Sequence, residues 1–296
     1  MEAATFKRNR DYVGYLMIAP AYSIYFLFIV VPILTGFYYS FTNYDFYKTK
    51  DFIGLRNYIG VFGDALFRQS LANTLIYSLC TIVPIMVMGM ILAVLLNKNI
   101  TGRRFYRSVL YIPNVTSMVA ISMIWLWIYD PTYGILNRMM KIIGAEPVQW
   151  LFNPKTAMGC VIIMSIWRGI GYNMVVYLAG LQSIPQSLYE AAKVDGASGL
   201  RQFFTITIPM LKPTTFFLFV TGCVGSFMVF EQVNILTSGG PLNTTTTIVH
   251  QIYLNAFQNF RMGYASAMAM VLLVITAAIT MINFKYGNQG NDLDID

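Results

Sequence analysis

Long apolar runs that are almost free of charged side chains dominate the sequence. A helix crosses the hydrocarbon core of a bilayer with about 20 residues, and each run is long enough. The runs predict transmembrane helices at about 13–41, 70–97, 108–129, 157–183, 213–236 and 262–284. Only two charges fall inside them, Arg168 and Glu231. The runs lack strand alternation, and a backbone in lipid must satisfy its own hydrogen bonds, so we expect an all-α integral membrane protein with six spans.

Composition supports one membrane domain rather than a soluble protein. Of the 296 residues, 56% are hydrophobic and only 11% are charged, whereas soluble domains are about a quarter charged. We expect a single domain over residues 1–286 and a flexible polar tail over 287–296. The formal net charge of +7 fits contact with anionic membrane lipid, because no basic patch suited to nucleic acid occurs.

The distribution of Lys and Arg predicts how the chain is oriented. With the N-terminus in the cytoplasm, inner segments carry more of these residues than outer ones, and one inner loop, NKNITGRRFYRS, holds Lys98, Arg103, Arg104 and Arg107. The positive-inside rule therefore predicts a multi-pass protein of the cell membrane with both termini cytoplasmic. A basic segment precedes the first span, as in a signal peptide. The apolar run is too long and no small-x-small cleavage site follows, so we interpret it as a retained helix.

Residues that catalyse reactions or bind metals are scarce. His250 is the only histidine, so no histidine-based metal site or catalytic triad can be assembled. All three cysteines, Cys80, Cys160 and Cys223, fall inside predicted spans, where buried thiols are expected rather than a disulfide or a metal site. The sequence predicts no catalytic residue and no bound metal.

A polar segment, EAAKVDGASGLRQFFTITIPML at residues 190–211, separates the fourth and fifth spans. Pro185 suits the start of a helix and Gly196 suits the turn after it, so we expect a short helix and then a second one from near Ser198 or Gly199. Exposed alanines would let another backbone approach closely, and Glu190 would offer a carboxylate to a partner's donor. The residues alone leave two interpretations open, a docking element and an ordinary amphipathic connector.

The same segment carries a recognisable motif. EAA at 190–192 is followed by Gly196, then Ile206 and Pro209. This arrangement resembles the cytoplasmic signature of ABC importer membrane subunits, and more specifically the carbohydrate-uptake permeases that include the maltose, lactose and glycerol-3-phosphate importers. The resemblance covers nearly the whole chain, through FTNYD (41–45), FIGLRNY (52–58), LYIPNV (110–115), LAGLQSIP (178–185) and LTSGGP (236–241). Some larger relatives have extra N-terminal spans and a large periplasmic domain, and we expect neither here.

The resemblance implies a type I importer permease fold, in which residues 184–212 (the coupling segment) seat a helix in a groove of a cytoplasmic ATPase. Carried over residue by residue, the ATPase-contact positions are Glu190, Ala191, Ala192, Asp195, Gly196 and Ala197. It also implies two copies of the ATPase, a second permease subunit that is a homologue or another copy, and an extracytoplasmic solute-binding protein. The sequence holds no GxxxxGK(S/T) phosphate loop, so ATP and magnesium are expected on the ATPase and no cofactor on this chain.

The two charges inside the spans point to a polar cavity, since a charge in the membrane is costly and normally faces a partner or water. On the fourth span, one helical face is formed or bordered by Ser165, Arg168, Gly169, Tyr172 and Asn173. On the fifth, Phe227, Glu231 and Asn234 have the same spacing, and Ser226 is adjacent to them. Aromatic faces with amides and carboxylates suit sugar rings and hydroxyls. The resemblance implies that the positions of Ser165, Gly169, Tyr172 and Ser226 line the substrate cavity.

Alternatives remain for these residues and for the protein class. The face could serve helix packing, with an internal Arg168–Glu231 pair, or Arg168 could recognise a charged sugar or glycerol phosphate. A membrane-embedded enzyme would need a nucleophile–base or metal cluster, and a secondary transporter would need inverted repeats and several carboxylates. The sequence favours a passive permease subunit for a sugar, with an oligosaccharide preferred from the habit of the family.

Overall fold

The computed structural model describes residues 15–47 and 50–287. Within these residues the regular structure is helical, apart from an isolated antiparallel bridge between Thr42 and Phe52, which confirms the expected all-α class. The expected tail lies, beyond Gly287, outside the described residues. The chain forms two compact units, residues 15–64 with 252–273 and residues 65–251 with 274–287.

The first unit contains the helix Tyr15–Ser40, which includes η1 (Phe26–Val30) and α2 (Val31–Ser40), and the short helix α3 (Arg56–Gly63). It also includes η3 (Leu254–Gln258) and the first part of α15 (Met262–Gly287). The Asn57 side-chain amide donates to the carbonyls of Ser40 and Thr42 at 2.9 and 2.8 Å. Tyr264 donates to the Asp64 carboxylate at 3.1 Å. These bonds join α3 and the residue after it to the end of α2 and to α15.

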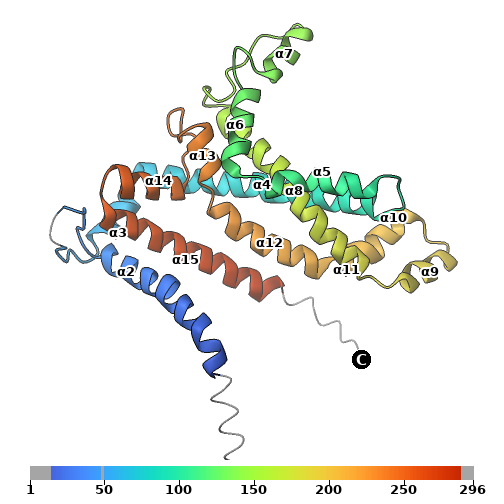
Figure 1. Ribbon diagram of the computed structural model, residues 1–296, viewed down its shortest axis with the longest axis horizontal. Helices are drawn as coiled ribbons and strands as arrows, with labels where there is room; N and C mark the ends of the chain where they lie inside the picture. Colours follow the sequence, from blue (N-terminus) through green and yellow to red (C-terminus); the bar gives the residue numbers. More distant parts are fainter. Residues whose placement is uncertain (1–14, 48–49, 288–296) are drawn as a thin grey trace, which may run out of the picture. The chain divides into compact units, whose positions relative to one another are not determined.

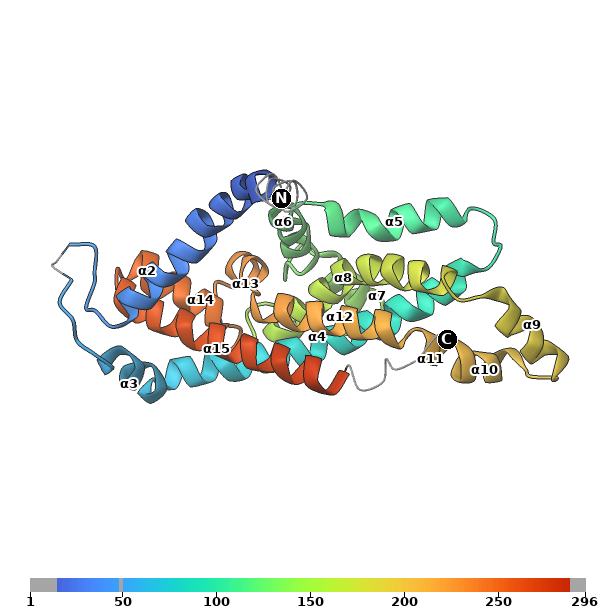
Figure 2. The ribbon, with the colours of Figure 1, turned by 90° about the horizontal axis from the view of Figure 1, so that it is seen from below.

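The second unit is built around the long helix α4 (Ala65–Asn97), against which α8 (Ala157–Gln182) and α12 (Lys212–Phe227) pack (Figure 1). Helix α5 (Arg103–Val115) packs along α8, and α6 (Met118–Ile128) meets α13 (Glu231–Leu236). The remaining helices of the unit are α7 (Ile135–Ile142), α9 (Gln186–Val194), α10 (Gly199–Gln202), η2 (Phe203–Thr207), α11 (Ile208–Met210) and most of α14 (Ile248–Tyr253). Figure 2 shows α9 and α10 at one end of this unit, beyond the ends of α4 and α5.

Small residues allow these helices to pack closely. A Cβ atom on Gly89 of α4 would lie 2.7 Å from the Cβ atom of Asn173 on α8. A Cβ atom on Gly171 would collide with the carbonyl of Leu110 on α5. Such close backbone approach is typical of helix pairs in membranes, where small residues occupy the contact.

Four helices are long and apolar enough to cross a membrane by themselves, namely Tyr15–Ser40, Ala65–Asn97, Ala157–Gln182 and Met262–Lys285. Two further segments qualify as bent pairs, α5 with α6 at 99° and Gly199–Met210 with α12 at 60°. Counting each pair as one span brings the total for the described residues to six.

Two of the expected spans, 108–129 and 213–236, contain a break in the helix. The first breaks at Thr116, whose backbone is extended, between α5 and α6. The second ends at Phe227 and resumes at Glu231. Hydropathy did not reveal the second break because Met228, Val229 and Phe230 are as apolar as the helices around them. A break in this setting is tolerated only where protein groups satisfy the freed backbone.

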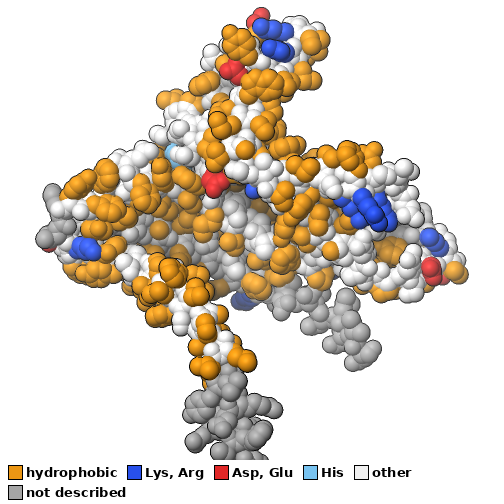
Figure 3. Space-filling model, viewed as in Figure 1, with side chains coloured by type: hydrophobic (Ala, Val, Ile, Leu, Met, Phe, Trp, Pro, Cys, Tyr) orange, Lys and Arg blue, Asp and Glu red, His pale blue; other side chains and the backbone are white. Residues whose placement is uncertain are grey.

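The outward surface of the second unit is apolar. Along α4, Leu79, Val83, Val87 and Ile91 recur every four residues and are all exposed, so they form one stripe on the helix. Figure 3 shows hydrophobic side chains spread widely over the visible face, with Lys and Arg in a few groups toward the ends of helices. This distribution is that of a protein whose helices face lipid.

Candidate functional site

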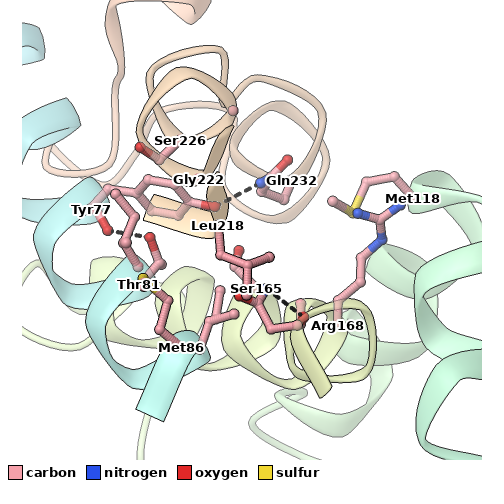
Figure 4. A pocket seen from close by; sticks show the side chains of 15 residues that line it. Tyr77, Thr81, Met86, Met118, Ser165, Arg168, Leu218, Gly222, Ser226 and Gln232 are labelled. Carbon is pink, nitrogen blue, oxygen red and sulfur yellow. Dashed lines mark hydrogen bonds between the residues drawn. The ribbon is translucent and has the colours of Figure 1, made fainter. Parts of the chain in front are cut away.

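A polar cavity of about 260 Å³ lies among α4, α6, α8, α12 and α13 (Figure 4). Three aliphatic side chains, two methionines and three glycines form much of its wall. The polar lining residues are Tyr77, Thr81, Ser165, Arg168, Asn173, Ser226 and Gln232. The cavity therefore combines apolar surface with hydroxyl, amide and guanidinium groups.

Hydrogen bonds hold the polar groups of the cavity in place. The Gln232 side-chain amide donates to the Tyr77 hydroxyl at 2.9 Å, which joins α13 to α4. Ser165 and Ser226 donate to carbonyls of their own helices at 2.8 and 2.9 Å. Because each hydroxyl oxygen has two lone pairs, these groups still offer acceptors to a ligand. Asn173 and Arg168 supply donors.

Arg168 connects the cavity to the break between α5 and α6. Its Nη2 donates to the carbonyl of Asn114, near the end of α5, at 3.3 Å. A cation at a helix C-terminus is favourable because the last carbonyls have no partner in the helix. Its Nε is buried and has no hydrogen-bond partner among the described residues. Figure 4 shows the side chain extending from α8 toward Met118. One cation thus lines the cavity and stabilises the bend beside it.

The structure brings five of the nine predicted substrate-pathway residues to this cavity: Ser165, Arg168, Gly169, Asn173 and Ser226. The other four, Tyr172, Phe227, Glu231 and Asn234, do not line it. The face shared by Phe227, Glu231 and Asn234 does not exist, because the helix ends at Phe227 and restarts at Glu231.

The internal pair between Arg168 and Glu231, expected if this face served packing, is not formed in the described part of the chain. Glu231 lies exposed in the first turn of α13, whereas Arg168 donates to Asn114. A carboxylate is favourable at a helix N-terminus, so Glu231 has a local role that sequence spacing did not suggest.

Sequence reasoning missed three of the polar lining residues, Tyr77 and Thr81 on α4 and Gln232 on α13. A signal for the α4 residues was available. Within that apolar span, buried hydroxyl residues recur at helical spacing, namely Ser70, Thr74, Tyr77, Ser78 and Thr81. Such a polar stripe in a span indicates a protein-facing or cavity-facing side. No comparable signal marks Gln232, because its position depends on the break before α13.

The coupling segment forms two helices around a tight turn. Helix α9 ends at Val194, and Gly196 has φ +74°, the left-handed conformation that favours glycine. The N–H of Gly196 donates to the carbonyl of Lys193 at 3.0 Å, and that of Ala197 to the carbonyl of Ala192 at 2.8 Å. These two bonds are a Schellman motif. The hydroxyl of Ser198 then accepts the N–H of Arg201 and caps α10.

The predicted ATPase-contact positions lie together at this turn and are accessible. Glu190, Ala191, Asp195 and Gly196 are exposed, and Ala192 and Ala197 are partly exposed. Two apolar side chains flank them, Val194 at 88% exposure and Leu200 at 71%. A Cβ atom on Gly196 would meet nothing within 4 Å. The turn therefore presents a small, partly apolar surface to which another protein can bind.

The described residues of the cavity and of the coupling-segment turn are better suited to binding than to catalysis. No group of three or more His, Cys, Asp or Glu that could hold a metal ion occurs in the described ranges. The cavity contains no carboxylate, thiol or imidazole. Its groups can pair with hydroxyls and with an anion, which suits passage of a polar solute rather than its conversion.

Comparison with known proteins identifies the family. Residues 85–286 match the family described as binding-protein-dependent transport system inner membrane component. This match covers more than half of the chain, including the cavity residues from Ile85 onward and the whole coupling segment. The chain belongs to this family, and it is a transporter permease of the inner membrane rather than an enzyme.

Individual relatives agree with this assignment. The chain is 37% identical to the probable ABC transporter permease protein YurN of Bacillus subtilis, over 95% of this chain and 97% of the relative. It is 34% identical to the sn-glycerol-3-phosphate transport system permease protein UgpA of Agrobacterium fabrum, over 92% and 93%. A crystal structure of a bacterial ABC transporter that imports the acidic polysaccharide alginate matches with a TM-score of 0.87 and 25% identity, over 97% and 99% of the two chains. The predicted importer permease fold is thereby confirmed.

Proposed function

We propose that this permease carries a sugar into the cytoplasm, with an oligosaccharide preferred, as one subunit of an ATP-driven importer. The observation that supports this most directly is the cavity, in which hydroxyls of Tyr77, Ser165 and Ser226 and the amide of Gln232 lie beside apolar walls. Sugars present apolar C–H faces and hydroxyls that both donate and accept, and such a lining complements both. The alginate importer, a similar structure, transports a polysaccharide.

The proposal includes four kinds of partner. The family is binding-protein-dependent, which supports an extracytoplasmic solute-binding protein as the donor of the sugar. The ABC class of the relatives supports two copies of an ATPase that bind ATP and magnesium. A second, homologous permease subunit would complete the pathway, and membrane lipid surrounds both.

The coupling segment is proposed to transmit the ATPase movement. Glu190, Ala191, Ala192, Asp195, Gly196 and Ala197 would contact the ATPase, and the Schellman turn would keep that surface rigid. The hydroxyl of Tyr189 on α9 bonds that of Thr207 at 2.9 Å, so α9 moves together with the segment that leads into α12. A displacement of the turn would therefore move α8 and α12, which carry cavity residues. This movement would open the cavity alternately to the two sides of the membrane.

The proposed orientation places both termini and the coupling segment in the cytoplasm. The excess of Lys and Arg on inner segments supports it. Cysteines introduced singly at Ser198 and at the outer-loop residue Asn153 would test it with a membrane-impermeant thiol reagent on intact cells. Labelling of the Ser198 position without lysis would contradict the orientation.

Uptake by the importer, reconstituted in proteoliposomes with its partner subunits, tests the function. We expect ATP-dependent accumulation of a labelled oligosaccharide, and a several-fold higher KM in Gln232→Ala and Ser165→Ala variants. Thr221→Ala, which changes an exposed hydroxyl outside the cavity, serves as the control. Uptake that persists without ATPase activity, and that is lost when the ion gradient is dissipated, would instead support a secondary transporter.

A charged sugar or glycerol phosphate is the second candidate substrate, favoured by the guanidinium of Arg168 in a cavity lining that contains no carboxylate. The similar alginate and glycerol-3-phosphate transporters carry anionic solutes. Comparing uptake of neutral and acidic oligosaccharides by wild type, Arg168→Gln and Arg168→Lys would decide between the two. Loss of only the acidic substrate in Arg168→Gln, with partial recovery in Arg168→Lys, supports the anion. An unchanged preference contradicts it.

A further inference from the structure

A second cavity of about 360 Å³ lies where α4 and α8 end and the coupling segment begins. Residues of α4 and of the turn after it, of α8, of α9 and of the α10–η2 region all contribute to its wall. An adjoining cavity of about 310 Å³ shares four residues with it, Asn97, Leu181, Gln186 and Tyr189. Both cavities are lined by Asn97 at the end of α4 and by Gln186 and Tyr189 of α9.

The charges around this cavity are all positive. Lys98 and Lys193 are among its lining residues, and no carboxylate is. Glu190, on the same helix as Lys193, is outside the lining set. Neither lysine ammonium has a hydrogen-bond or ion-pair partner within residues 15–47 and 50–287. The side chains of Asn97 and Gln186 add amide donors.

Hydrogen bonds and burial hold the wall in a defined shape. Gln186, Tyr189 and Lys193 lie on one face of α9 and all line the cavity. Tyr189 is bonded to the buried Thr207 at 2.9 Å, and the buried Gln202 donates its side-chain N–H to the carbonyl of Ala197 at 2.9 Å. Helix α9 begins at Gln186, so its N-terminus adds positive partial charge near the same wall.

We propose that this cavity binds a phosphate group, supplied by an anionic lipid headgroup or by a soluble phosphorylated compound. Two ammonium groups with amide donors form charge-assisted hydrogen bonds to phosphate oxygens. The inference rests on the proposed function in one respect, that the coupling segment moves relative to α4 during transport. A phosphate held by Lys98 on one side and Lys193 on the other bridges the two parts, and transport slows.

Binding is tested on the purified full-length chain, without partner subunits. The thermal midpoint is measured in detergent with increasing inorganic phosphate against sodium chloride at equal ionic strength. We expect phosphate to raise the midpoint of wild type, and Lys98→Gln with Lys193→Gln to weaken the apparent Kd roughly tenfold or more, since losing 1.4 kcal/mol of binding energy is tenfold. The control, Arg201→Gln with Lys212→Gln, removes the same charge from exposed positions outside the lining.

A parallel measurement identifies the source of the phosphate. The same variants are compared in nanodiscs of phosphatidylglycerol and of phosphatidylcholine. A response to inorganic phosphate in detergent assigns the site to soluble phosphate, and one confined to phosphatidylglycerol assigns it to lipid. A double lysine variant that behaves as wild type in both settings overturns the proposal.

The effect on transport is measured separately, so that failure of this site is distinguishable from failure of the proposed function. Phosphate enclosed in proteoliposomes, or phosphatidylglycerol in their membrane, is expected to slow uptake by wild type several-fold and to spare the double lysine variant. Equal slowing of both overturns the inhibitory role. Absence of any ATP-dependent uptake would contradict the proposed function and leave the binding result intact.

Discussion

The hydroxyl of Thr247 donates a hydrogen bond of 2.9 Å to the carbonyl of Val229, and both residues are buried. Val229 lies in the break between α12 and α13, where a carbonyl has lost its helical partner. Arg168 does the same for Asn114 near the other break. In each case a side chain distant in sequence satisfies backbone that a span leaves open, as the low polarity of the surroundings requires.

Thr247→Val is expected to destabilise the protein by about 1–3 kcal/mol, because it leaves a buried carbonyl without a donor while keeping the side-chain shape. Thr247→Ser keeps the hydroxyl and should lose less. Thr221→Val, the same change at an exposed hydroxyl bonded within its own helix, is the control. Thermal unfolding of the purified variants measures the difference. Equal midpoints for the Thr247 and Thr221 valine variants would show that the break does not depend on this bond.

Gly196→Val is expected to abolish uptake while the chain still folds. A β-branched residue at φ +74° is strained by roughly 1–2 kcal/mol, and its side chain would project from the proposed ATPase surface. Gly196→Asn, which tolerates this conformation better, should keep part of the activity. Gly199→Ala, nearby with no left-handed backbone, should be normal. Uptake rates of the three variants provide the comparison, and wild-type transport by Gly196→Val contradicts the coupling role.

Glu190→Lys is expected to release the ATPase. The exposed carboxylate would accept a donor from the partner, and a charge-assisted bond of this kind contributes about 1.5–3 kcal/mol, so reversal of the charge should weaken association at least tenfold. Copurification of the ATPase with the tagged permease measures this. Glu146→Lys, the same reversal at an exposed position between α7 and α8, should retain the ATPase. If Glu190→Lys also retains it and transports normally, the contact is elsewhere.

Removing the Tyr77–Gln232 bond should affect stability and substrate binding together. Gln232→Ala leaves the buried Tyr77 hydroxyl without this donor and is expected to cost about 1–3 kcal/mol. Tyr77→Phe removes the other partner. A double-mutant cycle on unfolding free energy and on the KM of uptake separates the two effects. Additive effects of the two changes would show that the bond seen between α4 and α13 has no energetic weight.

Acidification is expected to destabilise the region around α14 through His250. Its ring lies beside that of Phe230, and burial lowers the pKa of His250 below its usual 6.5. The unfolded chain therefore binds a proton that the folded chain does not, so stability is complete above pH 6.5 and falls as the pH drops through the folded pKa. His250→Gln should flatten this dependence. Identical pH profiles of unfolding for the two proteins would contradict it.

The sequence by itself determined the class of protein and indicated the turn and the cavity that we propose as its functional parts. Uncharged apolar runs have no stable place outside a bilayer, so they identify the spans without any knowledge of packing. The motif around Gly196 was equally local, because a helix end and a left-handed turn depend on adjacent residues. The charge at Arg168 marked the cavity, since a cation inside a span needs a polar surrounding.

Only the tertiary structure decided where the fifth span breaks and which residues meet in the cavity. No glycine or proline occupies 228–230. The carbonyl that the break leaves open is bonded by Thr247, which lies seventeen residues after Phe230. Once α13 starts anew at Glu231, Gln232 rather than Glu231 reaches the cavity and bonds Tyr77. Helical spacing describes one continuous helix, so it could not predict faces on either side of a break that a distant side chain stabilises.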